Sequence, residues 1–181
     1  MYDIMADLEL LSVLPNAVIL SIGAVAFDEE GIINTNGFYA KVDPVDCMKQ
    51  GLEVDAETVA WWMQQPDELR LDMFGRDTFR SGLPLREALS NFSDWLGLNG
   101  DGTIWVRGPD CDITILANAY RTVDMEIPWD FWCTRDLRTL EDAAWMGDSY
   151  FRPDRSSPKH HALHDAVYQA QCAVAAMKAL S

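Results

Sequence analysis

Two carboxylates within the first apolar run constrain this chain more than any other feature of its sequence. Residues 3–10 are predicted to form a β-strand, and Asp7 and Glu9 stand two positions apart near its end. Residues i and i+2 of a strand point to the same face of the sheet. Two carboxylates on one face repel each other and are costly to desolvate. A divalent metal ion between them would offset both costs, so the leading interpretation is a metal site, and the alternative is a solvated pair with no catalytic role.

The order of the apolar segments predicts a mixed α/β fold. Three early segments with short connections suggest an antiparallel meander, and strands alternating with helices follow. The expected strands are residues 3–10, 18–27, 38–42, 103–106 and 131–134, and the expected helices are residues 55–65, 85–96, 113–120, 137–145 and 161–180. Residues 147–159 are polar and rich in Pro and Ser, which predicts a loop. Without an internal repeat or a long linker, residues 1–181 are expected to form a single domain.

The charge balance limits how such a chain could bind nucleic acid. The chain has 29 Asp and Glu against 14 Lys and Arg, a formal net charge of −15. Long nucleic acids are gripped mainly through Lys and Arg on phosphates. Two interpretations remain: the protein avoids or mimics polyanions, or it binds only a short end through metal ions and local basic residues.

The cysteines and the apolar windows indicate the compartment. Cys47, Cys111, Cys133 and Cys172 are far apart, which argues against a zinc ribbon and against a disulfide framework and favours reduced thiols in a cytoplasmic protein. We expect no membrane helix, because no window of 18 apolar residues exists. We expect no signal peptide, because no basic flank precedes an apolar core.

A histidine cluster near the start of the last helix is the second candidate for chemistry. All three histidines fall within residues 160–164, and Asp165 follows at once. His160 and His164 have the i, i+4 spacing of a zinc pair, but the zinc-protease pattern needs Glu where His161 stands. The remaining alternatives are a solvated helix terminus and a general base, for which the near-neutral pKa of histidine is suited.

A third candidate lies where the strand at 103–106 ends. The chain turns through Gly108 and Pro109, and Asp112 opens the next helix. Asp112 could cap that helix or act as a ligand. Asp110 is a competing candidate on the same turn.

Together these motifs resemble the DEDD superfamily of 3′–5′ exonucleases, in its histidine-bearing DEDDh branch. Asp7 and Glu9 match the first motif, and Asp112 at a helix start matches the second. The third motif is the stretch from His160 to Asp165. The resemblance covers most of the chain and implies a ribonuclease H-like fold, with a mixed five-stranded sheet flanked by helices.

Further segments narrow the resemblance to one subgroup, which contains phage exonuclease A and a mycobacterial-type exoribonuclease. Residues 15–28 resemble the subgroup's P-x-A-x-I-x-S-I-G-A-V-x-F-D stretch. The pair Trp61 and Trp62 and the segment 135–140 also resemble the corresponding segments of the subgroup. We expect at least one of the two tryptophans in the core; the alternative interpretation places one of them near the substrate cleft.

The resemblance also implies a mechanism. Two divalent ions, Mg²⁺ or Mn²⁺, would be held by carboxylates, with Asp7 bridging both ions. Glu9 and Asp165 would hold the ion on the nucleophile side, and Asp112 the other ion through water. His160 would take a proton from the attacking water. The implied reaction hydrolyses DNA or RNA from the 3′ end to nucleoside monophosphates.

The chain departs from its relatives beside two of the motifs. Leu10 and Leu11 follow Glu9, where relatives have Thr and a small residue, and Cys111 stands where an aromatic residue usually precedes the aspartate. No metal ligand is lost, so the departures bear on how the terminal nucleotide is seated.

Arginines and exposed apolar surface bear on partners. Arg107, Arg135 and Arg138 are the expected phosphate contacts. Exposed apolar area around the tryptophan-rich helices could support a homodimer. The rival function is a catalytically inactive acidic binding protein on an exonuclease fold; the net charge favours it, and the complete set of five site residues argues against it.

Overall fold

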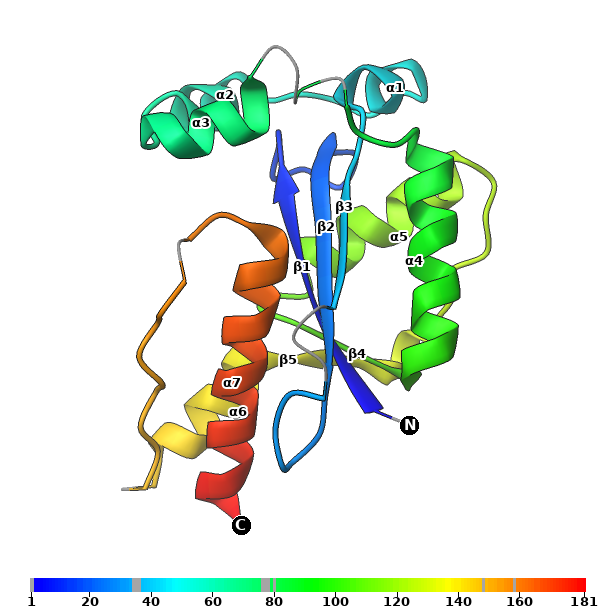
Figure 1. Ribbon diagram of the computed structural model, residues 1–181. Coiled ribbons are helices and arrows are strands. Elements are labelled where there is room, and N and C mark those ends of the chain that lie inside the picture. Colours follow the sequence, from blue (N-terminus) through cyan, green and yellow to red (C-terminus); the bar gives the residue numbers. More distant parts are fainter. Residues whose placement is uncertain (1, 34–36, 76–78, 80, 148, 158) are drawn as a thin grey trace.

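A computed structural model describes residues 2–33, 37–75, 79, 81–147, 149–157 and 159–181, and it shows a mixed five-stranded sheet flanked by helices (Figure 1). The strands are β1 Tyr2–Leu10, β2 Ile19–Phe27, β3 Phe38–Lys41, β4 Gly100–Val106 and β5 Thr134–Asp136. The helices are α1 Pro44–Lys49, α2 Ala56–Trp62, α3 Asp67–Phe74, α4 Leu85–Asn99, α5 Asp112–Thr122, α6 Leu137–Trp145 and α7 Ala162–Leu180, with a 3₁₀ helix at Phe131–Cys133. The predicted fold class is confirmed.

The sheet has the order β3-β2-β1-β4-β5, and strand pairing changes from antiparallel to parallel at the central strand β1. Strands β1, β2 and β3 form the predicted antiparallel meander, whereas β4 and β5 run parallel to β1. Parallel neighbours need long crossovers, and helices supply them here. The first strand therefore lies in the middle of the sheet, with neighbours on both sides.

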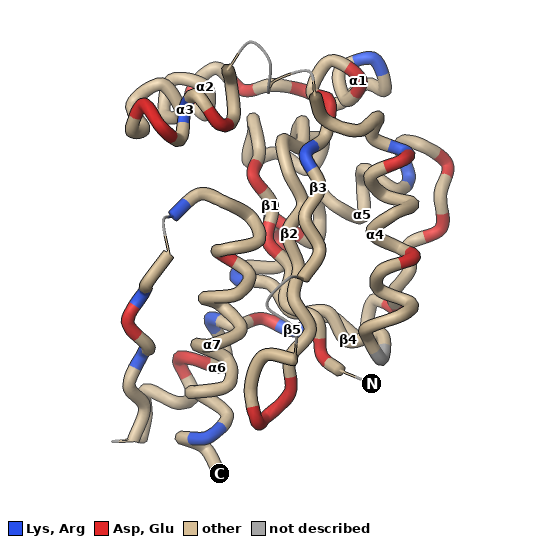
Figure 2. Tube along the Cα trace, viewed as in Figure 1, with Lys and Arg blue, Asp and Glu red and all other residues tan. Residues whose placement is uncertain are grey.

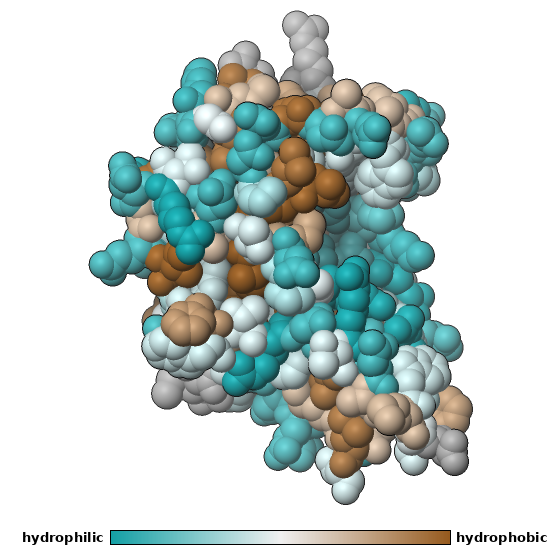
Figure 3. All heavy atoms as spheres, turned by 180° about the vertical axis from the view of Figure 1, so that it is seen from behind, coloured by the Kyte–Doolittle hydropathy of each residue, from teal (hydrophilic) through white to brown (hydrophobic). Residues whose placement is uncertain are grey.

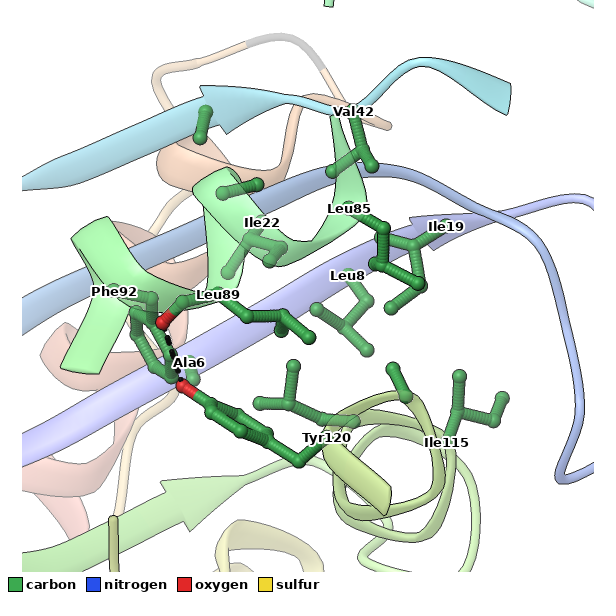
Figure 4. Close-up of a cluster of buried hydrophobic side chains, with 14 of the residues drawn as sticks. Ala6, Leu8, Ile19, Ile22, Val42, Leu85, Leu89, Phe92, Ile115 and Tyr120 are labelled. Atoms are coloured by element: carbon green, nitrogen blue, oxygen red, sulfur yellow. Dashed lines mark hydrogen bonds between the residues drawn. The ribbon is translucent and has the colours of Figure 1, made fainter. Parts of the chain in front are cut away.

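Alternate residues of β1 face two different helical layers. Ile4, Ala6 and Leu8 pack in the core under α4 and α5, where the Tyr120 hydroxyl donates a hydrogen bond of 2.9 Å to the Leu89 carbonyl oxygen (Figure 4). Met5 joins the opposite cluster, which contains residues of α6 and α7. Asp7 and Glu9 have the parity of Met5, so they point toward α7.

The approach of α7 to the sheet depends on a glycine in β2. Gly23 pairs with Asp7 across the β1–β2 ladder. A Cβ atom at Gly23 would lie 2.2 Å from the backbone carbon of Ala162 and 2.2 Å from the backbone nitrogen of Leu163. The first turn of α7 thus packs directly on the strand beside Asp7, which only a residue without a side chain permits.

The structure corrects the prediction for residues 131–134. The segment from Phe131 to Cys133 is a 3₁₀ helix, and the edge strand begins at Thr134. The apolar run was misleading because Phe131, 83% exposed, does not enter the core. Tertiary pairing with β4 places the strand instead.

Two short helices were not predicted. The Asp43–Pro44 pair, which looked like the end of a strand, is the start of α1, and the Asp43 carboxylate accepts a hydrogen bond of 2.8 Å from the Val45 amide. Helix α3 begins after Pro66 and has a single buried residue, Met73, so it lacks a clear apolar stripe. Both helices lie with α2 beyond the carboxyl end of β1 (Figure 1).

No helix in the described part of the chain is both long and apolar enough to cross a membrane. Large apolar side chains remain exposed, and Figure 3 shows apolar groups in several patches interrupted by hydrophilic residues. A cytoplasmic location and a homodimer stay predictions.

We expect Gly23→Ala to destabilise the fold by at least about 1–3 kcal/mol, because the new methyl group meets backbone that cannot rotate away. Urea denaturation measures the change. Gly97→Ala, in α4 with no atom within 4 Å of the new Cβ, is the matched control and should leave stability unchanged or slightly raised. Equal stability of the two variants would contradict the close approach of α7.

Candidate active site

Three carboxylates from two distant segments converge beside the central strand. Asp7 and Glu9 come from β1 and Asp165 from the first turn of α7, and one ligand oxygen of each lies within 4.8 Å of the others. They line a cavity of about 640 Å³ together with His160. The structure thus brings together four of the five predicted site residues in a single cleft.

The fifth predicted residue, Asp112, belongs to the same electrostatic cluster. It is the first residue of α5, and its charge raises the pKa of both Asp7 and Glu9. Its carboxylate does not cap the helix, because Cys111 occupies the cap position. Asp112 does not belong to the group of Asp7, Glu9 and Asp165, whose ligand oxygens lie within 4.8 Å of one another. The competing candidate Asp110 is exposed to solvent.

Burial and mutual repulsion make the carboxylates resist ionisation. Burial is the largest cause of the raised pKa of Asp7, followed by the charges of Asp112, Glu9 and Asp165. Burial and the neighbouring Asp165 and Asp112 raise the pKa of Glu9 to about 8, which Arg155 partly opposes. Burial raises the pKa of Asp112 to about 7. The cluster therefore favours the binding of a positive charge.

Neighbouring side chains and amides hold the carboxylates in place. Gln169 follows Asp165 by one helical turn, and its Nε2 donates a hydrogen bond of 2.6 Å to Asp7 Oδ1. Arg155 binds Asp165 Oδ1, while Asp165 Oδ2 accepts hydrogen bonds from the His160 and His161 amides at 2.7 and 3.1 Å. No sequence pattern assigned a role to Gln169 or Arg155, although Gln169 follows Asp165 of the third motif by only four residues.

The loop before α7 places His160 at one end of the cleft. His160 has a φ of 65°, a left-handed conformation that is uncommon for a residue with a side chain. The hydrogen bonds that two backbone amides donate to Asp165 hold this turn. Burial is the main cause that lowers the pKa of His160, so the imidazole is neutral at neutral pH. His161 caps α7 and stacks on the exposed His164 with ring centroids 4.1 Å apart. Among the described residues, no group of three or more potential metal ligands includes His160 or His164.

The two tryptophans differ in burial, and the prediction that at least one lies in the core is confirmed. Trp62 is buried, and its Nε1 donates a hydrogen bond of 2.8 Å to the Leu10 carbonyl oxygen. Trp61 is 42% exposed and lies edge-on to His160, with ring centroids 4.9 Å apart. Leu11 is buried in the core, so the unusual pair after Glu9 fixes α2 and contributes apolar packing.

The basic residues of the cleft come mostly from the loop before α7. Of the three predicted phosphate contacts, Arg107 lines the cleft. Arg138 is exposed beside Gly108, and its charge lowers the pKa of Asp112, whereas Arg135 donates to backbone oxygens of its own segment. The other cations that line the cleft are Arg152, Arg155 and Lys159. Nothing in the polar composition of residues 147–159 indicated that the loop folds back on the site.

The fold and the acidic cleft together define a protein of the DEDDh nuclease class. A crystal structure described as the nuclease domain of 3′hExo, a DEDDh family member, bound to rAMP has the same fold: the TM-score is 0.61 at 15% sequence identity, over 98% of this chain and 92% of that chain. No curated protein sequence matches the chain significantly. The model of the 3′-5′ exoribonuclease Rv2179c-like domain family matches residues 2–177, so the chain belongs to this family of 3′–5′ exonucleases.

The raised pKa of Glu9 predicts how stability changes with pH. The folded protein binds a proton at Glu9 up to a pH of about 8, whereas the unfolded chain releases it near 4.5. The stabilisation from this proton is complete below pH 4.5 and is lost as pH rises toward 8. Relative to Glu9→Gln, wild-type protein in EDTA should therefore lose free energy of unfolding between pH 5 and 8, measured by urea denaturation. If the free energies of unfolding of wild type and Glu9→Gln differed by the same amount at pH 5 and at pH 8, the pKa of Glu9 would not be raised.

Proposed function

We propose that residues 1–181 form one exonuclease domain that hydrolyses nucleic acid from its 3′ end and releases nucleoside monophosphates. The observation that carries the proposal is the convergence of Asp7, Glu9 and Asp165 beside His160. The family description names an exoribonuclease and the similar crystal structure holds rAMP, so RNA is the substrate to test first.

The donor set fits two Mg²⁺ or Mn²⁺ ions. Asp7, Glu9, Asp112 and Asp165 offer carboxylate oxygens, the ligands that these hard cations prefer. Burial, together with carboxylate repulsion at Asp7 and Glu9, raises the pKa of three of them, and the neighbouring arginines oppose this only in part, which supports the binding of cations. Bound ions would polarise the scissile phosphate and stabilise charge on the attacking and leaving oxygens.

His160 is proposed as the general base. Its lowered pKa keeps the imidazole in the neutral form that can accept a proton from water. The hydrogen bonds that the His160 and His161 amides donate to Asp165 hold the histidine turn next to this proposed metal ligand. Asp165 would hold the ion and already accepts hydrogen bonds from the histidine turn, so it would place metal and base relative to each other.

Trp61 is proposed to contact the terminal base. Its ring is exposed and lies beside His160, at the end of the cleft where the nucleophile would form. Aromatic side chains stack on bases of any sequence, which suits an enzyme that removes successive nucleotides.

Asp7→Asn is expected to abolish both metal binding and 3′-end hydrolysis, because the charges of all three other carboxylates raise the pKa of Asp7, which places it at the centre of the cluster. Calorimetric titration with Mn²⁺ and hydrolysis of a labelled oligonucleotide measure the two effects. Asp110→Asn, with the same charge change on the exposed turn, should retain both. Full activity in Asp7→Asn would refute the proposed ligand set.

His160→Ala is expected to lower the rate by on the order of 10²–10⁴. In the wild type, the rate should rise with pH as His160 loses its proton, at a pH below the ordinary histidine value of 6.5. The variant should lack this limb, whereas His164→Ala, a change at an exposed histidine of the same segment, should keep it. An unchanged limb in His160→Ala would assign the base to another group.

The rival is an inactive binding protein on the same fold. It predicts that an oligonucleotide is bound and remains intact with Mg²⁺, Mn²⁺ or EDTA. Metal-dependent loss of the 3′ nucleotide separates the two functions.

A further inference from the structure

A buried carboxylate of α6 joins two arginines from distant segments. Glu141 is 2% exposed, and its Oε1 accepts hydrogen bonds of 2.8 Å from Arg152 Nε and from the Tyr150 hydroxyl. Arg107, just after β4, forms an ion pair of 3.2 Å with Glu141 Oε2. A buried charge is stable only with such partners, so Glu141 fixes two guanidinium groups at one place.

The two arginines keep one side toward the catalytic cleft. Both line the cavity that contains Asp7 and Glu9, and their side chains are 30% and 39% exposed for Arg107 and Arg152. A guanidinium has five N–H donors, so the contacts with Glu141 do not exhaust them. Paired, immobilised guanidinium groups are well suited to the oxygens of a phosphate.

Positive charge is concentrated in this cleft although the chain is acidic. Four of the 14 Lys and Arg residues line the one cavity, namely Arg107, Arg152, Arg155 and Lys159. Asp and Glu are spread along the rest of the trace, including α1, α3 and the outer loops (Figure 2). Once protons or metal ions neutralise Asp7, Glu9 and Asp165 in the same cleft, these cations attract a phosphate there, and the acidic surface elsewhere repels a polyanion.

The arginine pair lies away from the nucleophile. His160 contacts Trp61 of α2, which lies beyond the N-terminal end of α7, whereas the arginines contact Glu141 of α6, which packs along the side of α7 (Figure 1). In an in-line displacement the attacking and leaving oxygens lie on opposite sides of the phosphorus. With His160 on the nucleophile side, the leaving strand would lie on the far side of the scissile phosphate, and Arg107 and Arg152 line the same cavity at a distance from Trp61 and His160.

We propose that Arg107 and Arg152 bind the backbone phosphate that follows the scissile one on the 5′ side, with Glu141 as the positioning residue. The inference rests on the proposed function, in which His160 defines the nucleophile side. It assigns the cleft a second phosphate site besides the metal-binding one. Substrates that offer this second phosphate should be preferred over those that offer only the scissile phosphate.

Two short substrates test the second phosphate site. A dinucleotide with one phosphodiester has only the scissile phosphate, and a trinucleotide adds the next one. Arg152→Gln should lose kcat/KM for the trinucleotide by on the order of 10-fold more than for the dinucleotide, because a charged hydrogen bond is removed. Arg121→Gln, the same change at an exposed position of α5, should lower neither.

The salt dependence gives a second readout. The slope of log(kcat/KM) against log[salt] for the trinucleotide should become shallower by about 0.7 in Arg152→Gln, the effect of one lost phosphate contact on a single strand. Glu141→Gln should show the same selective loss on the trinucleotide, with a raised KM and a retained kcat, as expected when the arginines lose their position. Because Arg152 is partly exposed, its substitution tests the site even where Glu141→Gln impairs folding.

Equal losses on both substrates, or no loss on either, would overturn the second phosphate site. Hydrolysis of the dinucleotide by the wild type reports on the proposed function alone. The two proposals therefore fail by different results.

Discussion

The site depends on the contact between Gly23 and the first turn of α7. This contact places Asp165 and Gln169 next to Asp7, which pairs with Gly23 in the sheet. Segments from the two ends of the sequence then present carboxylates to the same small volume. The backbone can approach this closely only because β2 has no side chain at that position.

Repulsion among the carboxylates opposes the approach of α7 to the sheet, and the neighbouring side chains and amides offset this repulsion only in part. Arg155, Gln169 and two backbone amides engage Asp165 and Asp7, yet the pKa values of Asp7, Glu9 and Asp112 stay raised. A site with residual negative charge and oxygen ligands selects divalent cations. The same cleft also contains two arginines held by Glu141, so the proposed cation site and the proposed phosphate site would share one cavity.

Much of the site could be predicted from the sequence because strand and helix periodicities determine which side chains share a face. The alternation in β1 predicted that Asp7 and Glu9 face the same layer, and the division of Ile4 and Met5 between two cores supports it. The helix start at Asp112 and the histidine before Asp165 were found from their spacing. The early antiparallel strands were also predicted correctly.

The missed features depend on contacts between distant segments. Helix α3 has no apolar stripe, and α1 begins at an Asp-Pro pair that also suits the end of a strand. Glu141 is an acidic residue in an amphipathic helix, which predicts solvent exposure, and its burial follows only from the arrival of Arg107 and Arg152. The exposure of Phe131 likewise has no sequence signal, because its apolar neighbours resemble a strand.

The most direct test of the central claim follows both ends of one single-stranded RNA with wild-type protein. In Mn²⁺, a 3′-terminal label should be released at once as a nucleoside monophosphate, while a 5′ label should persist in products that shorten one nucleotide at a time. EDTA should stop both changes. Internal fragments at the earliest times, release that continues in EDTA, or full retention of the 3′ label on RNA and on DNA would contradict a metal-dependent 3′–5′ exonuclease.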